Sequence, residues 1–153
     1  MATLLQQSEN LKKLNESVIE QQLFKAIREA EVVILDANKE QLSNGENYLG
    51  GEVGRYSPYT QGFADAKETF TNVPKKEGSL YNFDWTGDFL KGFKLGINGN
   101  EATITSNVLG DDSKLNFLLN NNLFGLNDEN LKKIIQSEIL PFIHSFARKT
   151  LNI

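Results

Sequence analysis

The sequence contains no cysteine and only one histidine, His144. The lack of cysteine excludes a disulfide, a thiol nucleophile and a zinc site built on thiolates, and it leaves the redox compartment open. His144 falls within a predicted helix, and no carboxylate stands near it in the sequence. We therefore expect His144 to lie on the surface or at the edge of the core rather than in a catalytic site.

Long apolar runs and clusters of basic residues are also missing. No stretch approaches the roughly 20 apolar residues that cross a bilayer, and the first residues lack a cationic segment followed by an apolar one. The 16 basic residues are scattered and the net charge is −4, so the sequence shows no cluster of positive charge of the kind that binds a phosphate backbone. We expect no membrane partner, no export by the usual signal and no direct sequence-specific nucleic-acid binding.

The chain has the length and composition of one soluble globular domain, 1–153. Of its 153 residues, 39% are hydrophobic and 24% charged, and a chain of that size buries roughly two thirds of its unfolded surface. No internal repeat or domain boundary divides it.

A long helix is predicted over residues 1–42. Ser8 is a plausible N-cap, and Asn44 with Gly45 is a plausible stop. The apolar residues of this region recur mostly at three- and four-residue spacing: Leu11, Leu14, Val18, Leu23, Ile27, Ala30, Ile34 and Ala37. Because such a helix is long for a domain this small, we expect part of it to lie against something outside the domain.

A loop rich in glycine and aromatic residues follows at 43–79. Its composition breaks regular structure, yet it carries more aromatic residues than an inert linker needs. Long loops of this kind commonly bind something or become ordered on assembly. We interpret it as an interaction arm, with a loop packed on its own domain as the alternative. Its candidate interface residues are Tyr48, Tyr56, Tyr59, Phe63 and Phe70.

Between residues 80 and 106 the hydrophobic period changes to two, which predicts a small antiparallel sheet. Three short runs alternate apolar with polar residues: Tyr81, Phe83 and Trp85; Phe93, Leu95 and Ile97; and Ala102 and Ile104. The step from Asn98 to Gly99 predicts a hairpin between the second and third runs, with a type I′ turn.

Helices are predicted again over 113–153. The segment 111–113 can cap the first of them, and Gly125 ends it. Asn127 or Asp128 starts a last helix, in which Pro141 should cause a kink or a division. The expected fold class is therefore α+β: a long N-terminal helix, a long loop, a small antiparallel β-sheet with a hairpin, and C-terminal helices packed on the sheet.

Each candidate for catalysis or ligand binding has a simpler structural explanation. Asp84 and Asp88 could act as the carboxylate pair of a glycoside hydrolase, but they flank a Thr-Gly turn, where aspartate is favoured for its backbone hydrogen bonds. Asp111 and Asp112 lack the spacing of an EF-hand, and capping explains them more simply. The glycines at 50, 51 and 54 are not followed by the Lys-Ser/Thr of a P-loop. We expect no catalytic residue, no cofactor and no metal.

Three segments resemble the tail-completion and head–tail connector (neck) proteins of tailed bacteriophages. They are Trp-Thr-Gly-Asp-Phe at 85–89, leading into the hairpin; Leu-Phe-Gly-Leu-Asn at 123–127, ahead of the last helix; and Tyr-Ser-Pro-Tyr-Thr at 56–60, before the sheet. The resemblance covers about 48–153. The loop at 43–79 is long for this family, which leaves open which ring of the assembly the chain would form.

The resemblance implies a virion structural protein, assembled in the bacterial host cytoplasm. It would form a homo-oligomeric ring at the head–tail junction or in the tail, in contact with portal, connector or tail proteins. The family carries no catalytic residues, so any site would be an interface. One alternative is a small non-enzymatic adaptor or regulatory module that binds through its N-terminal helix. The other is a hydrolase that uses Asp84 or Asp88.

Overall fold

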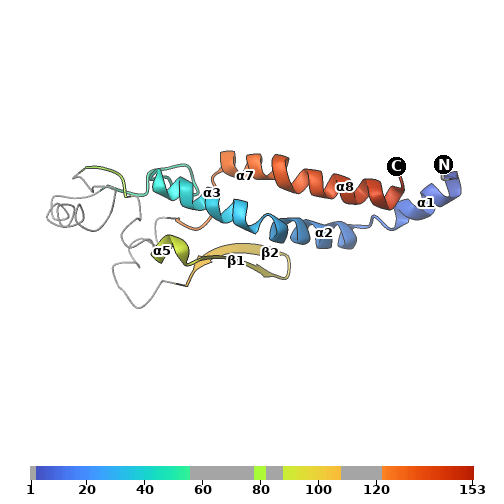
Figure 1. Ribbon diagram of the computed structural model, residues 1–153, viewed down its shortest axis with the longest axis horizontal. Helices are drawn as coiled ribbons and strands as arrows, with labels where there is room; N and C mark the ends of the chain where they lie inside the picture. The colour runs from blue at the N-terminus through green and yellow to red at the C-terminus, as the bar shows by residue number, and fades with distance from the viewer. Residues whose placement is uncertain (1–2, 56–77, 82–87, 108–121) are drawn as a thin grey trace.

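A computed structural model describes residues 3–55, 78–81, 88–107 and 122–153. The described part is elongated, and it has the α+β composition that the sequence predicts. Three N-terminal helices follow one another along the long axis, and the C-terminal helices run back beside them, so both termini lie at one end (Figure 1). A two-stranded antiparallel sheet lies on the other side of the N-terminal helices.

The single long helix predicted for 1–42 is not confirmed, because the segment divides into α1 (Leu4–Lys12), α2 (Glu16–Glu29) and α3 (Glu31–Ser43). The first break lies at Asn15, whose side-chain oxygen accepts from the backbone N–H of Val18 at 3.0 Å and caps α2. Asparagine favours such caps over helix interiors, and apolar spacing alone does not reveal this.

The ends of this helical segment also differ in part from the prediction. Ser8 lies inside α1, and Thr3 caps that helix instead, in a capping box with Gln6. At Ala30 a backbone ψ of 6° separates α2 from α3. The stop at Asn44 and Gly45 is confirmed, since α3 ends at Ser43 and Gly45 adopts a φ of +79°.

The hairpin is confirmed. After the short α5 (Asp88–Lys91), β1 (Phe93–Asn98) pairs with β2 (Glu101–Ser106). The turn differs from the predicted type I′. The pair Asn98–Glu101 closes it, so Gly99 is the first of its two central residues. Of these two residues, only Gly99 has a positive φ, of +57°. Glycine with positive φ at the first central position is typical of a type II′ turn. The run at Tyr81, Phe83 and Trp85 lies largely outside the described residues.

The C-terminal helical segment is divided ahead of Pro141, as predicted. It consists of α7 (Asp128–Ile134), the π-helical turn η2 (Ile135–Ile139) and α8 (Leu140–Leu151), and Asn127 caps α7. Proline has no N–H to donate and its ring crowds the preceding turn. The wider π turn stands directly before it, where an ordinary α-helical turn would meet that ring.

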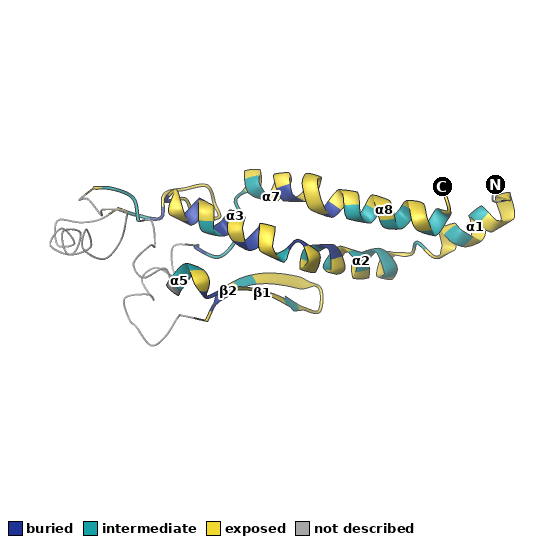
Figure 2. Cartoon of the chain, viewed as in Figure 1, coloured by how far each residue is buried: buried dark blue, intermediate teal, exposed yellow. Residues whose placement is uncertain are grey.

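Two hydrophobic clusters form the core. One joins α2 and α3 to α7 and η2 through the buried residues Ala26, Ala30, Ile34, Ile134 and Ile139. The other joins α3 to the hairpin and to residue 123 through Leu35, Leu42, Val53, Phe93 and Leu123. Leu95 and Ile104, opposite each other in the sheet, pack against both clusters. By contrast, α1 and α8, at the end that carries the termini, contain no buried residue (Figure 2).

Candidate assembly site

Two buried amides of α3 hold the segment that leads into α7. Asn38 and Gln41 are 0% and 2% exposed. Asn38 Nδ2 donates to the backbone oxygens of Leu123 and Gly125, at 3.1 and 2.8 Å. Gln41 Oε1 accepts from the backbone N–H of Asn127 at 2.8 Å. Because buried polar groups are costly unless they are paired, these bonds fix the segment 123–127 on α3.

Tyr48 is anchored beside this segment. Its backbone N–H donates to the carbonyl of Asn122 at 3.1 Å. Its Cβ also lies 3.1 Å from the place that a Cβ on Gly125 would occupy. The residue as a whole remains exposed, at 38%. The glycine of the Leu-Phe-Gly-Leu-Asn segment therefore permits the close approach of the Tyr48 turn.

The Tyr48 turn and the start of α7 enclose an acidic notch of about 450 Å³. Its described lining residues include Tyr48, Leu49 and Leu126, and the charged residues among those described are all acidic: Glu46, Asp128 and Glu129. Leu49 is exposed. The notch thus combines carboxylates with an uncovered apolar side chain.

An apolar groove of about 460 Å³ lies next to the notch, with Leu126 lining both. It runs between the hairpin, α2 and α3 on one side and α7 and η2 on the other, and none of the described residues that line it is charged. Three large hydrophobic residues of this lining are exposed: Leu23, Leu131 and Ile135. The groove is an uncovered apolar surface in the middle of the described chain.

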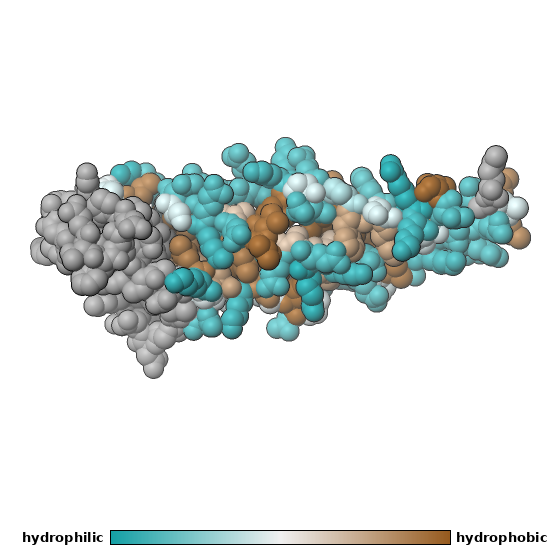
Figure 3. All heavy atoms as spheres, viewed as in Figure 1, coloured by the Kyte–Doolittle hydropathy of each residue, from teal (hydrophilic) through white to brown (hydrophobic). Residues whose placement is uncertain are grey.

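The end of the molecule that carries the termini exposes a second apolar surface. Leu4, Leu5 and Leu11 of α1 are 86%, 72% and 59% exposed, whereas the polar Gln7 and Asn10 of the same helix are half-buried. Helix α1 packs against α8 and therefore directs its leucines away from its own domain. Figure 3 shows hydrophobic residues both at this end and along the middle of the molecule.

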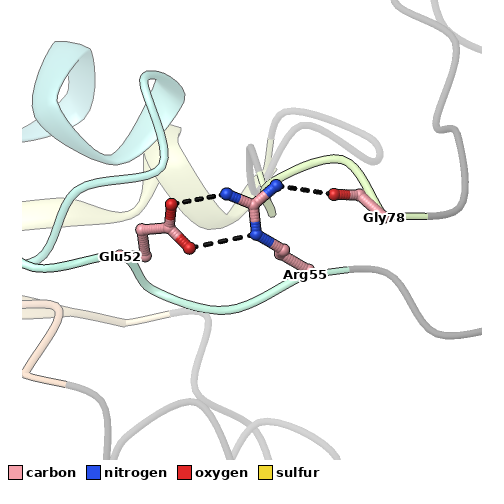
Figure 4. A network of polar contacts seen from close by, with 3 residues as sticks. All are labelled: Glu52, Arg55 and Gly78. Atoms are coloured by element: carbon pink, nitrogen blue, oxygen red, sulfur yellow. Dashed lines mark hydrogen bonds and ion pairs between the residues drawn. The ribbon is translucent and has the colours of Figure 1, made fainter.

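The two described ends of the long loop meet at Arg55. Its guanidinium binds the carboxylate of Glu52 and donates to the carbonyl of Gly78 at 2.8 Å (Figure 4). The hydrogen bond and the charge of Glu52 raise the pKa of Arg55. A β-bridge joins Arg55 to Leu80, and Val53 is buried in the core. The described base of the loop is thus packed on its own domain, and residues 55 and 78 lie side by side.

The residues singled out in the sequence have different positions. Of the five candidate interface residues, Tyr48 lies in the acidic notch, and the other four lie outside the described residues: Tyr56, Tyr59, Phe63 and Phe70. Asp84, Asp111 and Asp112 also lie outside them, and Asp88 begins α5. His144 is exposed on α8, as predicted.

Sequence reasoning missed Leu4 and Leu5 of α1, the groove and the amides Asn38 and Gln41. Two adjacent leucines ahead of the apolar repeat were the available signal for the first of these. Within the ranges that the structure describes, no group of three or more potential metal ligands is found, and no helix there is long and apolar enough to span a bilayer.

Comparisons with protein-family models, with curated proteins and with solved structures found no match.

Proposed function

We propose that the chain is a structural subunit of a homo-oligomeric ring in the virion of a tailed bacteriophage, at the head–tail junction or in the tail. The observation that carries the proposal is the uncovered apolar surface of the described chain, in the groove and on the leucines of α1. Contiguous apolar surface on a folded chain is typical of an interaction site. A subunit whose apolar surface is covered by neighbouring subunits in a ring exposes that surface when it is alone.

The chemistry of the groove also favours an assembly role over catalysis. Its described lining is uncharged, with leucine and isoleucine as the main side chains. General acid–base or nucleophilic chemistry requires a titratable or nucleophilic group within hydrogen-bonding reach of the reacting atom. A leucine-lined groove suits the apolar side chains of a protein partner better than a reacting substrate.

The place in a virion rests on the resemblance of three sequence segments to phage tail-completion and neck proteins. One of them, Leu-Phe-Gly-Leu-Asn at 123–127, is hydrogen-bonded to α3 and leads into α7. Residues of this segment line both the groove and the notch. On this proposal the neighbours of the ring are portal, connector or tail proteins, and the aromatic loop is a further contact surface.

The exposed leucines of α1 also support a second candidate function. A non-enzymatic adaptor could use the same helix to bind an unrelated protein, as amphipathic helices do when they occupy a groove. The two candidates differ in the state of the purified protein. The ring subunit associates with itself, whereas the adaptor remains a monomer until its partner is added.

The test is the molar mass of the purified protein, measured by light scattering over a concentration series and combined with negative-stain images. We expect a mass that rises with concentration to a fixed multiple of the subunit, with closed rings in the images. A monomer at every concentration would contradict the proposal and favour the adaptor.

A further inference from the structure

We propose that neighbouring copies join head to tail, with the leucines of α1 from one copy in the apolar groove of the next and the lysines of that helix at the acidic notch. This inference rests on the proposed homo-oligomer and identifies its two contact surfaces. The occupant of the groove is therefore a second copy of this chain.

The apolar parts of the two surfaces suit each other in chemistry and form. Leu4 and Leu11 stand seven residues apart, close to two helical turns, and Leu5 stands beside Leu4, so the three line one side of α1. A helix with such anchors is the usual occupant of an apolar groove. The groove, at about 460 Å³, is within the size range that buries several side chains.

The charges beside the apolar parts are complementary. Lys12 and Lys13 follow the leucines at the end of α1, and Arg148 and Lys149 lie in the last turn of α8 at the same end of the molecule. These four basic residues outnumber the nearby Glu9 and Glu16. In the notch that adjoins the groove, the charged residues within the described ranges are all acidic. Such complementarity favours one partner and one orientation.

The positions of the two surfaces determine the kind of assembly. The segment Asp128–Leu151 separates the notch from the basic end, a length on the order of 35 Å at the helical rise of about 1.5 Å per residue. A contact between two different, distant surfaces is heterologous, so each copy leaves one surface free for the next. Rotation between copies then closes a ring.

The first test replaces the three leucines with glutamine, which keeps helix propensity (L4Q/L5Q/L11Q). We expect self-association at least about a hundredfold weaker, measured by sedimentation velocity on the full chain, with unchanged thermal unfolding of the monomer. The matched control is V32Q/V33Q, which removes exposed apolar side chains of α3 outside the groove and should leave association unchanged.

The second test reverses charges. K12E/K13E and E46K/E129K should each weaken self-association about tenfold, and an equimolar mixture of the two variants should recover it, because each surface then meets an opposite charge. If the L4Q/L5Q/L11Q variant associates as strongly as the wild-type protein, the head-to-tail contact is wrong. It is also wrong if the mixture of charge-reversed variants does not recover self-association. Either result would leave the homo-oligomer itself unaffected. A monomeric wild-type protein would instead overturn the proposed function, and this inference with it.

Discussion

The Asn38 side chain forms two hydrogen bonds with the backbone of Gly125: Asn38 Nδ2 donates to the Gly125 carbonyl at 2.8 Å, and Asn38 Oδ1 accepts from the Gly125 N–H at 3.4 Å. The two residues are far apart in the sequence and belong to α3 and to the segment before α7. Replacement of Asn38 by alanine leaves buried backbone groups unpaired and opens a small cavity. We expect the free energy of unfolding to fall by about 3 kcal/mol, measured by urea denaturation.

The exposed Asn44 is the matched control for that experiment. It lies at the end of α3. Asn44→Ala should change the free energy of unfolding by less than about 0.5 kcal/mol. Equal losses from the two replacements would show that the buried amide has no special part in holding the segment 123–127.

Gly125 itself should tolerate no side chain. It has a φ of +147°, and a Cβ there would lie 3.1 Å from Tyr48 Cβ. Gly125→Ala therefore adds steric crowding to backbone strain and should lower the free energy of unfolding by more than about 2 kcal/mol. Gly50 separates the two effects, because it has a φ of +75° but open space around its Cβ position. Gly50→Ala should cost about 1 kcal/mol because alanine is strained at a positive φ, and thermal unfolding of both variants would compare them.

The division between α1 and α2 should depend on Asn15. Its side chain caps the Val18 N–H, and replacement by alanine removes that acceptor at an exposed position. We expect Asn15→Ala to destabilise the chain by about 1 kcal/mol without changing the denaturant slope. Ser17→Ala, two residues further on and also exposed, should have little effect. A larger loss at Ser17 than at Asn15 would contradict the capping role.

Salt should weaken the proposed head-to-tail contact. Exposed charges are screened over about 10 Å at 0.1 M ionic strength and about 3 Å at 1 M. We expect a rise from 0.1 to 1 M sodium chloride to weaken self-association of the wild-type chain severalfold, measured by sedimentation velocity. The K12E/K13E variant lacks the attraction between lysines and carboxylates, so added salt should not weaken its self-association further. Salt dependence of the same sign and size in both proteins would exclude an electrostatic contribution from α1.

The local parts of the fold could be predicted from the sequence. The alternation from Phe93 to Ile104 identified the hairpin, and Pro141 marked the division of the last helix. The turn type was wrong because pairing of Asn98 with Glu101 puts Gly99 first in the turn, and the hydrophobic alternation does not specify this register. Apolar spacing did not reveal the break at Asn15, because the cap forms through a polar side chain.

The candidate site was predicted less completely, because long-range packing builds it. Tyr48 was identified from composition, but its place beside Gly125 depends on contacts between distant segments. Periodicity assigned Leu11 to the inner face of a continuous helix. Once Asn15 ends that continuity, α1 packs on α8 through other residues, and Leu11 faces outward. The groove arises only when the hairpin and the two helical segments come together.

The π turn before Pro141 lets residues five apart in the sequence lie on the same face of the C-terminal helix. Ile134 and Ile139 are both buried, although side chains five residues apart in an uninterrupted α-helix would point about 140° apart. The wider turn absorbs the difference, much as an extra residue would. Deletion of one residue from η2 would therefore give an ordinary α-helical turn and leave the orientation of α8 unchanged, with Phe142 and Ile143 still packed against the core cluster that includes α2. The wider turn thus keeps the buried faces of the two halves on the same side of the helix, despite the additional residue.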